Sequence, residues 1–429
     1  MKLAIIGGGS FFTATIAHGI AHVAQKNGWP TDDLEVALFD VDPARAQLMA
    51  DYGKLLVRRG LLAARFTMSQ QRAEALDGAD VVIESVPFRE ENEQARELRE
   101  AFGVPETHQG PGAIPAFLAC MPFMRRLAQD MERYCPDALL LLLTNPTDMF
   151  ADAISRATEI AACGLCVEVY HLIDHLAFYF GWDPDEIQLH TVGVNHAGWS
   201  LRFFVGEEDG YELIRGRMAA LPEHPDFHPG NMLLVEAYQL TGYLRSSAFH
   251  PWPYRPSEPP LSWEEFHRRR RVVRGRTMLE LVRQALKRGE PLSGPEDRPP
   301  ELIEVRYRGT GRGVGRLLYA RDTGAEQVLT LQLRNGGAAE GWEPDFYLEL
   351  AVRAAGRVLR PIALGRPPEW LVGFEKALAL HNKLAVDYYF DRNLNTLKQA
   401  LAAVQLVAGT GALNSFAQAV HERFADSPQ

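Results

Sequence analysis

The first 165 residues alternate short apolar segments with longer segments of helical character. Strands are predicted at four of the apolar segments, namely Leu3–Ile6, Glu35–Phe39, Asp80–Ser85 and Ala138–Thr144. Helices are predicted between them over residues 10–25, 43–59 and 115–135. Continuously apolar strands separated by helices are typical of a parallel sheet that helices cover on both faces. The pattern therefore predicts an α/β fold that begins with a doubly wound, Rossmann-type parallel sheet.

The pattern changes after about residue 161, where the predicted helices become longer and the strands less regular. Residues 327–333 and 346–352 are predicted strands, and residues 370–407 are predicted to be mostly helical. A chain of 429 residues is also too long for one ordinary core. We therefore predict two domains, a Rossmann-type domain over residues 1–165 and an α+β domain over residues 166–429.

Composition and charge argue against several classes of protein. Apolar residues make up 46% of the chain and charged residues 23%, as is ordinary for a soluble globular protein. A net charge of -10 argues against general nucleic-acid binding, which needs a basic face. Four cysteines are too few for a disulfide framework, and no apolar run is long enough to span a bilayer. The chain opens with Met1 and a short strand rather than a signal peptide, so we expect a cytoplasmic protein with no membrane partner.

A glycine-rich segment, Gly7-Gly8-Gly9-Ser10, follows the first predicted strand and opens the first predicted helix. Glycine is required where a backbone turns tightly and approaches a pyrophosphate, and a helix N-terminus offers amide donors to that anion. The first two glycines of the G-x-G-x-x-G fingerprint are matched, whereas Phe12 stands at the third position. The context predicts dinucleotide binding through Gly7, Gly9, Ser10 and Phe11.

Asp40 closes the second predicted strand. A carboxylate there accepts a hydrogen bond from a ribose hydroxyl and would repel the 2′-phosphate of NADP, so the predicted cofactor is NAD. The spacing from the glycines is longer than the usual ~20 residues. The alternative interpretation is an ordinary tight turn followed by a strand-ending aspartate.

Three further segments carry side chains suited to binding. Asn145 follows the fourth predicted strand, at the end where ligands bind in parallel sheets, although Asn-Pro is also a common turn signal. Cys166 and His196 offer a thiolate and an imidazole, two common ligands of divalent metals, but cysteines are more often simply buried small side chains. His171 and His175 would share one face of a helix, either as a metal pair or as histidines bonded to nearby backbone.

Taken in order, these segments resemble the family 4 glycoside hydrolases, the NAD- and manganese-dependent glycosidases. The matching segments are Gly7–Ser10, Glu106-Thr107, Gly110–Gly112, Thr144–Pro146, Gly164–Cys166, Gly193–His196, Arg334–Gly337 and Leu348-Glu349. The stretch from Gly242 to Pro256 is similar to the α-galactosidase and α-glucosidase branch. The resemblance implies a fold like that of lactate and malate dehydrogenases, with NAD and Mn²⁺ or another divalent metal as cofactors. It also implies a small-molecule sugar as substrate and a homodimer or homotetramer.

The resemblance further implies cleavage by elimination instead of by two carboxylates. NAD would take a hydride from C3 of the sugar, a base would remove the acidified proton at C2, and the aglycone would leave from C1. Cys166 and His196 would bind the metal by this resemblance. Asn145 and Asn195 would hold sugar hydroxyls, with Asn145 also beside NAD and His196 beside the sugar. Tyr254 is the candidate base.

The sequence departs from the family pattern in two places. The position after the metal-binding cysteine, where the family places a candidate general acid, is Val167, which carries no proton to donate. Glu168, His171 or His175 would have to compensate, or the leaving group would need no acid. The segment after the third predicted strand, 85–89, also differs from the family's sugar-lining segment.

Two other functions therefore stay open. One is an NAD-dependent dehydrogenase of a polyol or hydroxy acid, which would need no metal at Cys166 and His196. The other is an NAD-binding sensor that has lost its chemistry, which Val167 favours.

Overall fold

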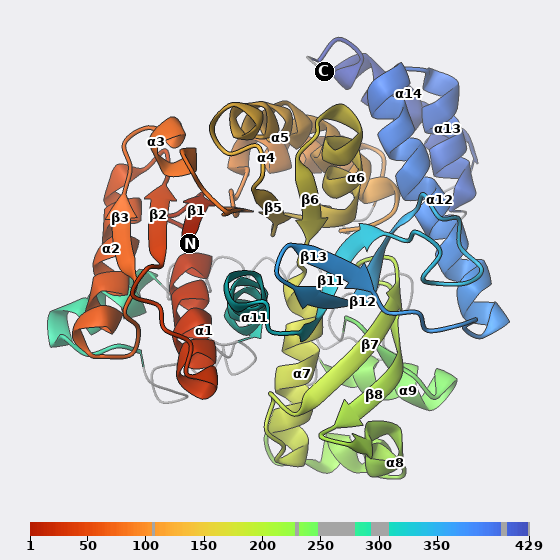
Figure 1. Cartoon of the computed structure of the whole chain (residues 1–429). Coiled ribbons are helices and arrows are strands. Elements are labelled where there is room, and N and C mark those ends of the chain that lie inside the picture. The colour runs from red at the N-terminus through yellow and green to blue at the C-terminus, as the bar shows by residue number, and fades with distance from the viewer. Residues whose placement is uncertain (105–107, 228–230, 248–278, 293–308, 405–409, 428–429) are drawn as a thin grey trace.

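The computed structural model describes residues 1–104, 108–227, 231–247, 279–292, 309–404 and 410–427 (Figure 1). In this part of the chain one large sheet runs through the molecule, and helices lie against both of its faces. The N-terminal half of the sheet is parallel and the C-terminal half is antiparallel. The two halves meet at a single antiparallel contact, between Gln332 and Gly164.

The parallel half contains six strands, which lie in the order 3-2-1-4-5-6. They are β1 (Lys2–Ile6), β2 (Glu35–Phe39), β3 (Arg65–Met68), β4 (Val81–Glu84), β5 (Leu139–Leu142) and β6 (Ala161–Gly164). Its helices are α1 (Phe11–Asn27), α2 (Pro43–Arg58), α3 (Arg72–Leu76), α4 (Arg89–Ala101), α5 (Ile114–Tyr134) and α6 (Thr147–Ala157). This is the strand order of the dinucleotide-binding Rossmann fold, and it confirms the predicted doubly wound sheet.

Alternate residues of β1 show why the strands of the parallel half of the sheet are continuously apolar. Leu3 and Ile5 belong to one buried cluster, and Ala4 and Ile6 belong to another on the opposite face. Successive side chains of a strand point to opposite faces, so a strand covered on both sides needs apolar residues at every position. Burial on both faces therefore explains why β1 is apolar at every position and shows no alternation of apolar and polar residues.

The C-terminal half continues the same sheet with antiparallel strands. They are β7 (Ile187–Gly193), β8 (Trp199–Val205), β9 (Glu208–Asp209), β10 (Leu244–Arg245), β11 (Gln327–Arg334), β12 (Tyr347–Ala355) and β13 (Val358–Pro361). Its helices are α7 (Val167–Phe180), α8 (Gly210–Ile214), α9 (Met232–Thr241), α11 (Gly309–Thr323), α12 (Glu369–Asp391), α13 (Leu394–Ala403) and α14 (Thr410–Phe424). The sheet continues across residue 165, because β11 pairs with β6. The predicted division into two domains at this residue stays a prediction.

Helices α1 and α11 lie side by side and join the two halves of the chain (Figure 1). Their backbones touch, because a Cβ atom placed on Gly19 would lie 1.8 Å from the carbonyl carbon of Gly311. A Cβ atom on Gly311 would in turn lie 1.9 Å from the carbonyl oxygen of Thr15. Glycine is therefore required at both positions for the helices to approach this closely.

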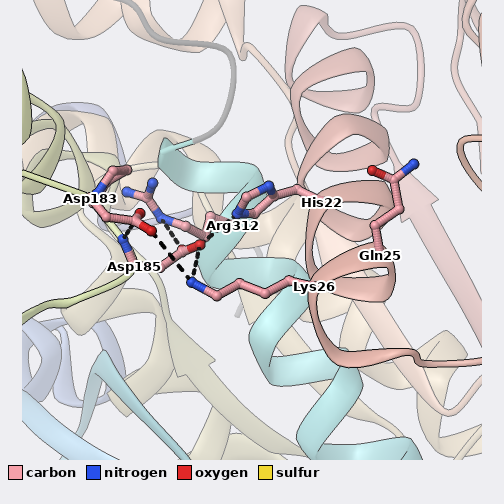
Figure 2. Close-up of a pocket in the computed structure, with 7 residues that line it drawn as sticks. His22, Gln25, Lys26, Asp183, Asp185 and Arg312 are labelled. Carbon is pink, nitrogen blue, oxygen red and sulfur yellow. Dashed lines mark hydrogen bonds and ion pairs between the residues drawn. The ribbon is translucent and has the colours of Figure 1, made fainter. Parts of the chain in front are cut away.

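A cluster of ionisable side chains also joins α1 to the C-terminal half of the chain (Figure 2). Asp185 accepts hydrogen bonds from the His22 imidazole at 2.7 Å and from the Lys26 ammonium at 2.8 Å. Burial raises the pKa of the Asp185 carboxyl, but the hydrogen bonds from His22 and Lys26 together lower this pKa by more. The net shift of the pKa is therefore downward. A pocket of about 480 Å³ lies beside this cluster, and Arg312 forms part of its wall. None of the residues predicted for the functional site lines this pocket.

The four cysteines are free and buried. In the described ranges, no helix combines the length and the apolar character needed to cross a bilayer.

The glycine contact between α1 and α11 gives a prediction about stability. Gly19→Ala is expected to lower the free energy of unfolding by about 3 kcal/mol or more, because the new methyl group has no room against the Gly311 backbone. Gly373→Ala in α12 is the matched control, since a Cβ there meets nothing within 4 Å. The control is expected to raise the stability by about 0.5–1 kcal/mol. Urea unfolding followed by circular dichroism measures both, and equal effects of the two changes would contradict the proposed packing.

Candidate active site

The glycine-rich turn between β1 and α1 is built against its neighbours so closely that side chains are excluded. Gly7 has a φ of 87°, and its amide donates to the carbonyl of Phe39 at 2.9 Å. A Cβ atom on Gly7 would lie 2.6 Å from the carbonyl oxygen of Ser85, and one on Gly9 would lie 2.7 Å from the Cβ of Arg45. These contacts explain why glycine stands at both positions.

Asp40 and Ser10 complete this turn. One carboxylate oxygen of Asp40 accepts from the amide of Gly9 at 2.8 Å, and the other accepts from the amide of Asp42 at 2.9 Å. Ser10 is the N-cap of α1 and its hydroxyl accepts from the amide of Phe12 at 3.3 Å. The first turn of α1 contains no acidic residue. A glycine turn followed by a helix N-terminus fits the pyrophosphate of a dinucleotide, and a carboxylate at the end of β2 fits its ribose.

Cys166 lies two residues after the end of β6 and occupies the N-cap position of α7. Burial, together with the negative charges of Glu349 and Glu168, raises the pKa of its thiol well above the ordinary value. Its sulfur lies 3.4 Å from Nε2 of His196, thirty residues along the chain. The structure thus brings together the two residues predicted as metal ligands.

The distance between these two atoms tests whether they fit one metal ion. Zinc-like ions bind cysteine sulfur at about 2.3 Å and histidine nitrogen at about 2.0–2.1 Å. Two such bonds that meet at a near-tetrahedral angle place sulfur and nitrogen roughly 3.4–3.6 Å apart, and the observed distance of 3.4 Å agrees. Among the residues that the structure describes, no group of three or more His, Cys, Asp and Glu side chains is placed to hold a metal ion.

Asn145 and Asn195 also come together. The side-chain amide of Asn195 donates to Oδ1 of Asn145 at 2.8 Å and to the hydroxyl of Thr147 at 3.0 Å. The amide of Gln332 lies 3.5 Å from Oδ1 of Asn195 and donates to the carboxylate of Glu349 at 2.8 Å. The two asparagines therefore belong to one hydrogen-bonded network beside the Cys166–His196 pair.

Thr147 and Gln332 were not predicted as site residues from the sequence. Gln332 lies on β11 and Thr147 begins α6, and neither residue is marked by an unusual motif. Glu349 was noted only as part of the Leu348-Glu349 match, yet it is fully buried and burial raises its pKa to about 7. Only the pairing of β6 with β11 and of β11 with β12 shows that these residues share a site.

Glu168 and His175, the two predicted catalytic residues that the structure describes, both lie on α7. Glu168 is in its first turn, where it accepts from the hydroxyl of Ser247 at 2.9 Å. His175 lies seven residues further, about 10 Å along the helix axis, and its Nδ1 lies 3.3 Å from the side-chain amide of Asn231. Glu168 is therefore much nearer to Cys166 than His175 is. Tyr254, the candidate base, lies outside the described residues.

His108 is a neighbour of the site that was not predicted. Its ring centroid lies 4.9 Å from that of His196, with the rings inclined by 33°. The next residue, Gln109, donates to Asp148, and the side chain of Asn382 on α12 donates to both. These contacts join the segment that follows Glu106-Thr107 to the C-terminal half of the chain. The only available signal was its position next to that motif.

The segment 85–89, where the sequence departs from the family pattern, lies between the turn and the asparagines. The Ser85 hydroxyl donates to the carbonyl of Gly7 at 3.4 Å. The hydroxyl of Thr144 lies 3.0 Å from both the Glu84 carboxylate and the Val86 carbonyl. A continuous line of contacts therefore runs along the carboxyl edge of the parallel strands, from Gly7 toward Asn145.

Two models of one protein family match most of this chain. The model of the family 4 glycosyl hydrolases matches residues 2–180, and the model of their C-terminal domain matches residues 191–407. An alpha-galactosidase of Bacillus subtilis is 28% identical over 270 residues, which cover 61% of each chain. A 6-phospho-beta-glucosidase of Thermotoga maritima is 21% identical over 417 residues, which cover 94% of this chain and 93% of the relative.

Solved structures show the same fold over nearly the whole chain. The 6-phospho-beta glucosidase from Thermotoga maritima, solved with manganese, NAD⁺ and glucose-6-phosphate, has a TM-score of 0.75 at 18% identity and covers 99% of this chain and 98% of its own. A 6-phospho-alpha-glucosidase from gut microorganisms, solved with NAD and Mn²⁺, has a TM-score of 0.77 at 18% identity, with coverages of 98% and 97%. Malate dehydrogenase from Plasmodium falciparum has a TM-score of 0.55 at 11% identity, covering 91% of this chain and 99% of its own, which confirms the dehydrogenase-like fold.

The relatives do not separate the branches of the family. An alpha-galactosidase and phospho-glucosidases of both anomeric types match at 20–28% identity, so the predicted placement nearer the α-galactosidase branch stays a prediction. The family itself is shown, because its two models together span residues 2–407 with one short gap. This chain belongs to the family 4 glycosyl hydrolases.

Proposed function

We propose that this chain is an NAD- and divalent-metal-dependent glycosidase that cleaves a small glycoside by oxidation at C3, deprotonation at C2 and elimination. The observation that carries the proposal is the 3.4 Å approach of the Cys166 sulfur to Nε2 of His196, beside Asn145 and Asn195. These side chains come from three separate segments of the sequence. The fold gathers them at the carboxyl edge of the parallel strands, where ligands bind in such sheets.

The geometry of the turn and of the Cys166–His196 pair supports a proposal for the residues that would hold the two cofactors. Gly7, Gly9, Ser10 and Phe11 would hold the pyrophosphate of NAD and Asp40 its ribose, with Asn145 beside the nicotinamide end. Cys166 and His196 would hold Mn²⁺ or another divalent ion. When bound, NAD supplies reversible oxidation of the sugar at C3, and the metal supplies Lewis acidity to the sugar oxygens.

The two asparagines suit the recognition of sugar hydroxyls. A carboxamide can both donate and accept, so Asn145 can bind a hydroxyl in either sense. The amide of Asn195 already donates to Asn145 and Thr147, so Asn195 would bind a hydroxyl through Oδ1. Their mutual hydrogen bond fixes the orientation of both side chains before a ligand arrives. His196, which follows Asn195, would lie beside the same sugar ring.

Proton transfer requires a base at C2 and an acid at the leaving oxygen. Tyr254 is the proposed base. Val167 carries no proton to donate, and Glu168 is the next residue of the first turn of α7. We therefore favour Glu168 over His175 as the group that assists departure of the aglycone.

The proposed reaction is tested with 4-nitrophenyl α-galactoside and α-glucoside and their 6-phosphates, in the presence of NAD⁺, Mn²⁺ and a reductant. Release of nitrophenol is expected to require both NAD⁺ and the metal. In D₂O the released sugar is expected to carry deuterium at C2, because the C2 proton is removed and replaced from solvent.

Two other outcomes would overturn this proposal. Accumulation of NADH in proportion to the sugar consumed would indicate a dehydrogenase. Tight NAD binding without turnover of any glycoside would indicate a sensor.

The assignment of the metal pair gives a second prediction. Cys166→Ser is expected to reduce the affinity for Mn²⁺ and the NAD-dependent activity by more than about 100-fold, because loss of a ligand should cost at least as much as loss of its supporting contacts. Cys163→Ser is the matched control, since Cys163 is also buried but lies within β6 opposite Leu141. Metal binding by isothermal titration and binding of NAD by fluorescence measure the two effects. Equal metal affinity in the two variants would contradict the assignment.

A further inference from the structure

His196 holds its imidazole in an uncommon backbone conformation. The amide of Ala197 donates to the carbonyl of Val194 at 2.9 Å, so residues 194–197 form a tight turn with His196 at its third position. The φ of His196 is 65°, in the left-handed region that only a few per cent of residues other than glycine adopt, with asparagine, aspartate and histidine the most frequent among them. A residue held there costs free energy, which contacts with the surrounding structure must offset.

Two buried ionisable side chains make such contacts, one on each side of His196. Glu375, on α12, accepts from the amide of Val194 at 2.7 Å. Arg245, on β10, donates to the carbonyl of His196 at 2.7 Å. Both side chains are 0% exposed. Ionisable side chains from distant parts of the chain thus bind both the Val194 N–H, at the start of the turn, and the His196 carbonyl.

The backbone around the turn is shaped to admit the Glu375 carboxylate. Gly193 has a φ of 131°, and a Cβ atom on it would lie 2.7 Å from the Cα of Gly198 and 2.9 Å from Oε2 of Glu375. The amide of Ser246, next to Arg245, donates to the carbonyl of Gly198 at 2.8 Å. Both ends of the loop 193–198 are therefore fixed against the elements that supply the two charged groups.

Burying such groups is costly. Burial raises the pKa of Glu375 to about 8, although the Val194 amide and the positive charge of Arg245 lower it in part. An apolar side chain of similar volume would cost less at a position of this kind. An apolar side chain, however, cannot accept from the Val194 amide or donate to the His196 carbonyl. The contacts that require these polar groups are those that hold the turn.

We propose that Glu375 and Arg245 are positioning residues that hold the His196 turn in its left-handed conformation and so place the imidazole opposite the Cys166 thiol. This inference rests on the proposed function, because it assumes that the two side chains bind one metal ion. It adds two residues, from α12 and β10, that act through His196 and do not touch the metal.

The experiment uses Co²⁺ as the probe and the metal-free protein, with no turnover required. Binding of Co²⁺ by Cys166 produces a thiolate-to-cobalt absorption band, and titration gives the affinity. Glu375→Leu and Arg245→Met are each expected to weaken Co²⁺ binding by about 10- to 100-fold, as is usual when a partner that orients a metal ligand is removed. Glu375→Gln keeps an acceptor oxygen for the Val194 amide and is expected to restore binding relative to Glu375→Leu.

Leu378→Ala is the control for a merely structural effect, because Leu378 is buried one turn along the same helix. It is expected to destabilise the protein but to leave the Co²⁺ affinity unchanged. NAD binding, measured in all variants, verifies that the nucleotide half is folded. Arg245→Lys, which keeps the charge with a different geometry, replaces Arg245→Met if that variant does not fold, and a weakened affinity is again expected.

The outcomes separate this inference from the proposed function. Absence of the thiolate band in the wild-type protein would overturn the metal pair, and the proposed function with it. If the wild type shows the band and Glu375→Leu and Arg245→Met bind Co²⁺ as tightly as the wild type, the positioning role alone is overturned. The same holds if Leu378→Ala weakens binding as much as they do.

Discussion

The site depends on the contact between the Cys166 thiol and the His196 imidazole, and that contact depends on the sheet. Cys166 follows β6 and His196 follows β7, and in the sheet these strands are separated by β11 and β12. Gln332 of β11 and Glu349 of β12 fill the space between them and are hydrogen-bonded to each other at 2.8 Å. A one-residue shift of register in β11 or β12 would move every side chain of that strand to the opposite face of the sheet and remove the hydrogen bond between Gln332 and Glu349.

The same region concentrates buried carboxyl groups. Burial raises the pKa of Glu349 to about 7 and that of Asp148 to about 6, and Glu349 adds to the upward shift of the Cys166 thiol. Negative groups that oppose ionisation of a thiol would be offset by a divalent cation bound to it, because metal binding favours the deprotonated ligand.

Several elements could be predicted from the sequence because their signals are local. The strand at Glu35–Phe39 was predicted with its observed bounds, since its apolar run ends at a polar residue on each side. The strand Arg65–Met68 was not predicted, because it lies at the edge of the sheet and only one of its four residues is buried. The predicted helix over 370–407 was correct in kind, but it is interrupted at Arg392, whose φ of 52° ends α12. No glycine or proline marks that break.

By itself the sequence determined the α/β class and the glycine turn, because each depends on residue type and on neighbours within a few positions. Cys166 and His196 were predicted as a pair from the resemblance to the family, not from their spacing. Only the tertiary structure decided that thiol and imidazole lie 3.4 Å apart, and that Gln332, Glu349, Glu375 and Arg245 surround them. These residues are brought together by pairing of strands that are far apart in sequence. The spacing of residues along the chain carries no record of which strands become neighbours in a mixed sheet.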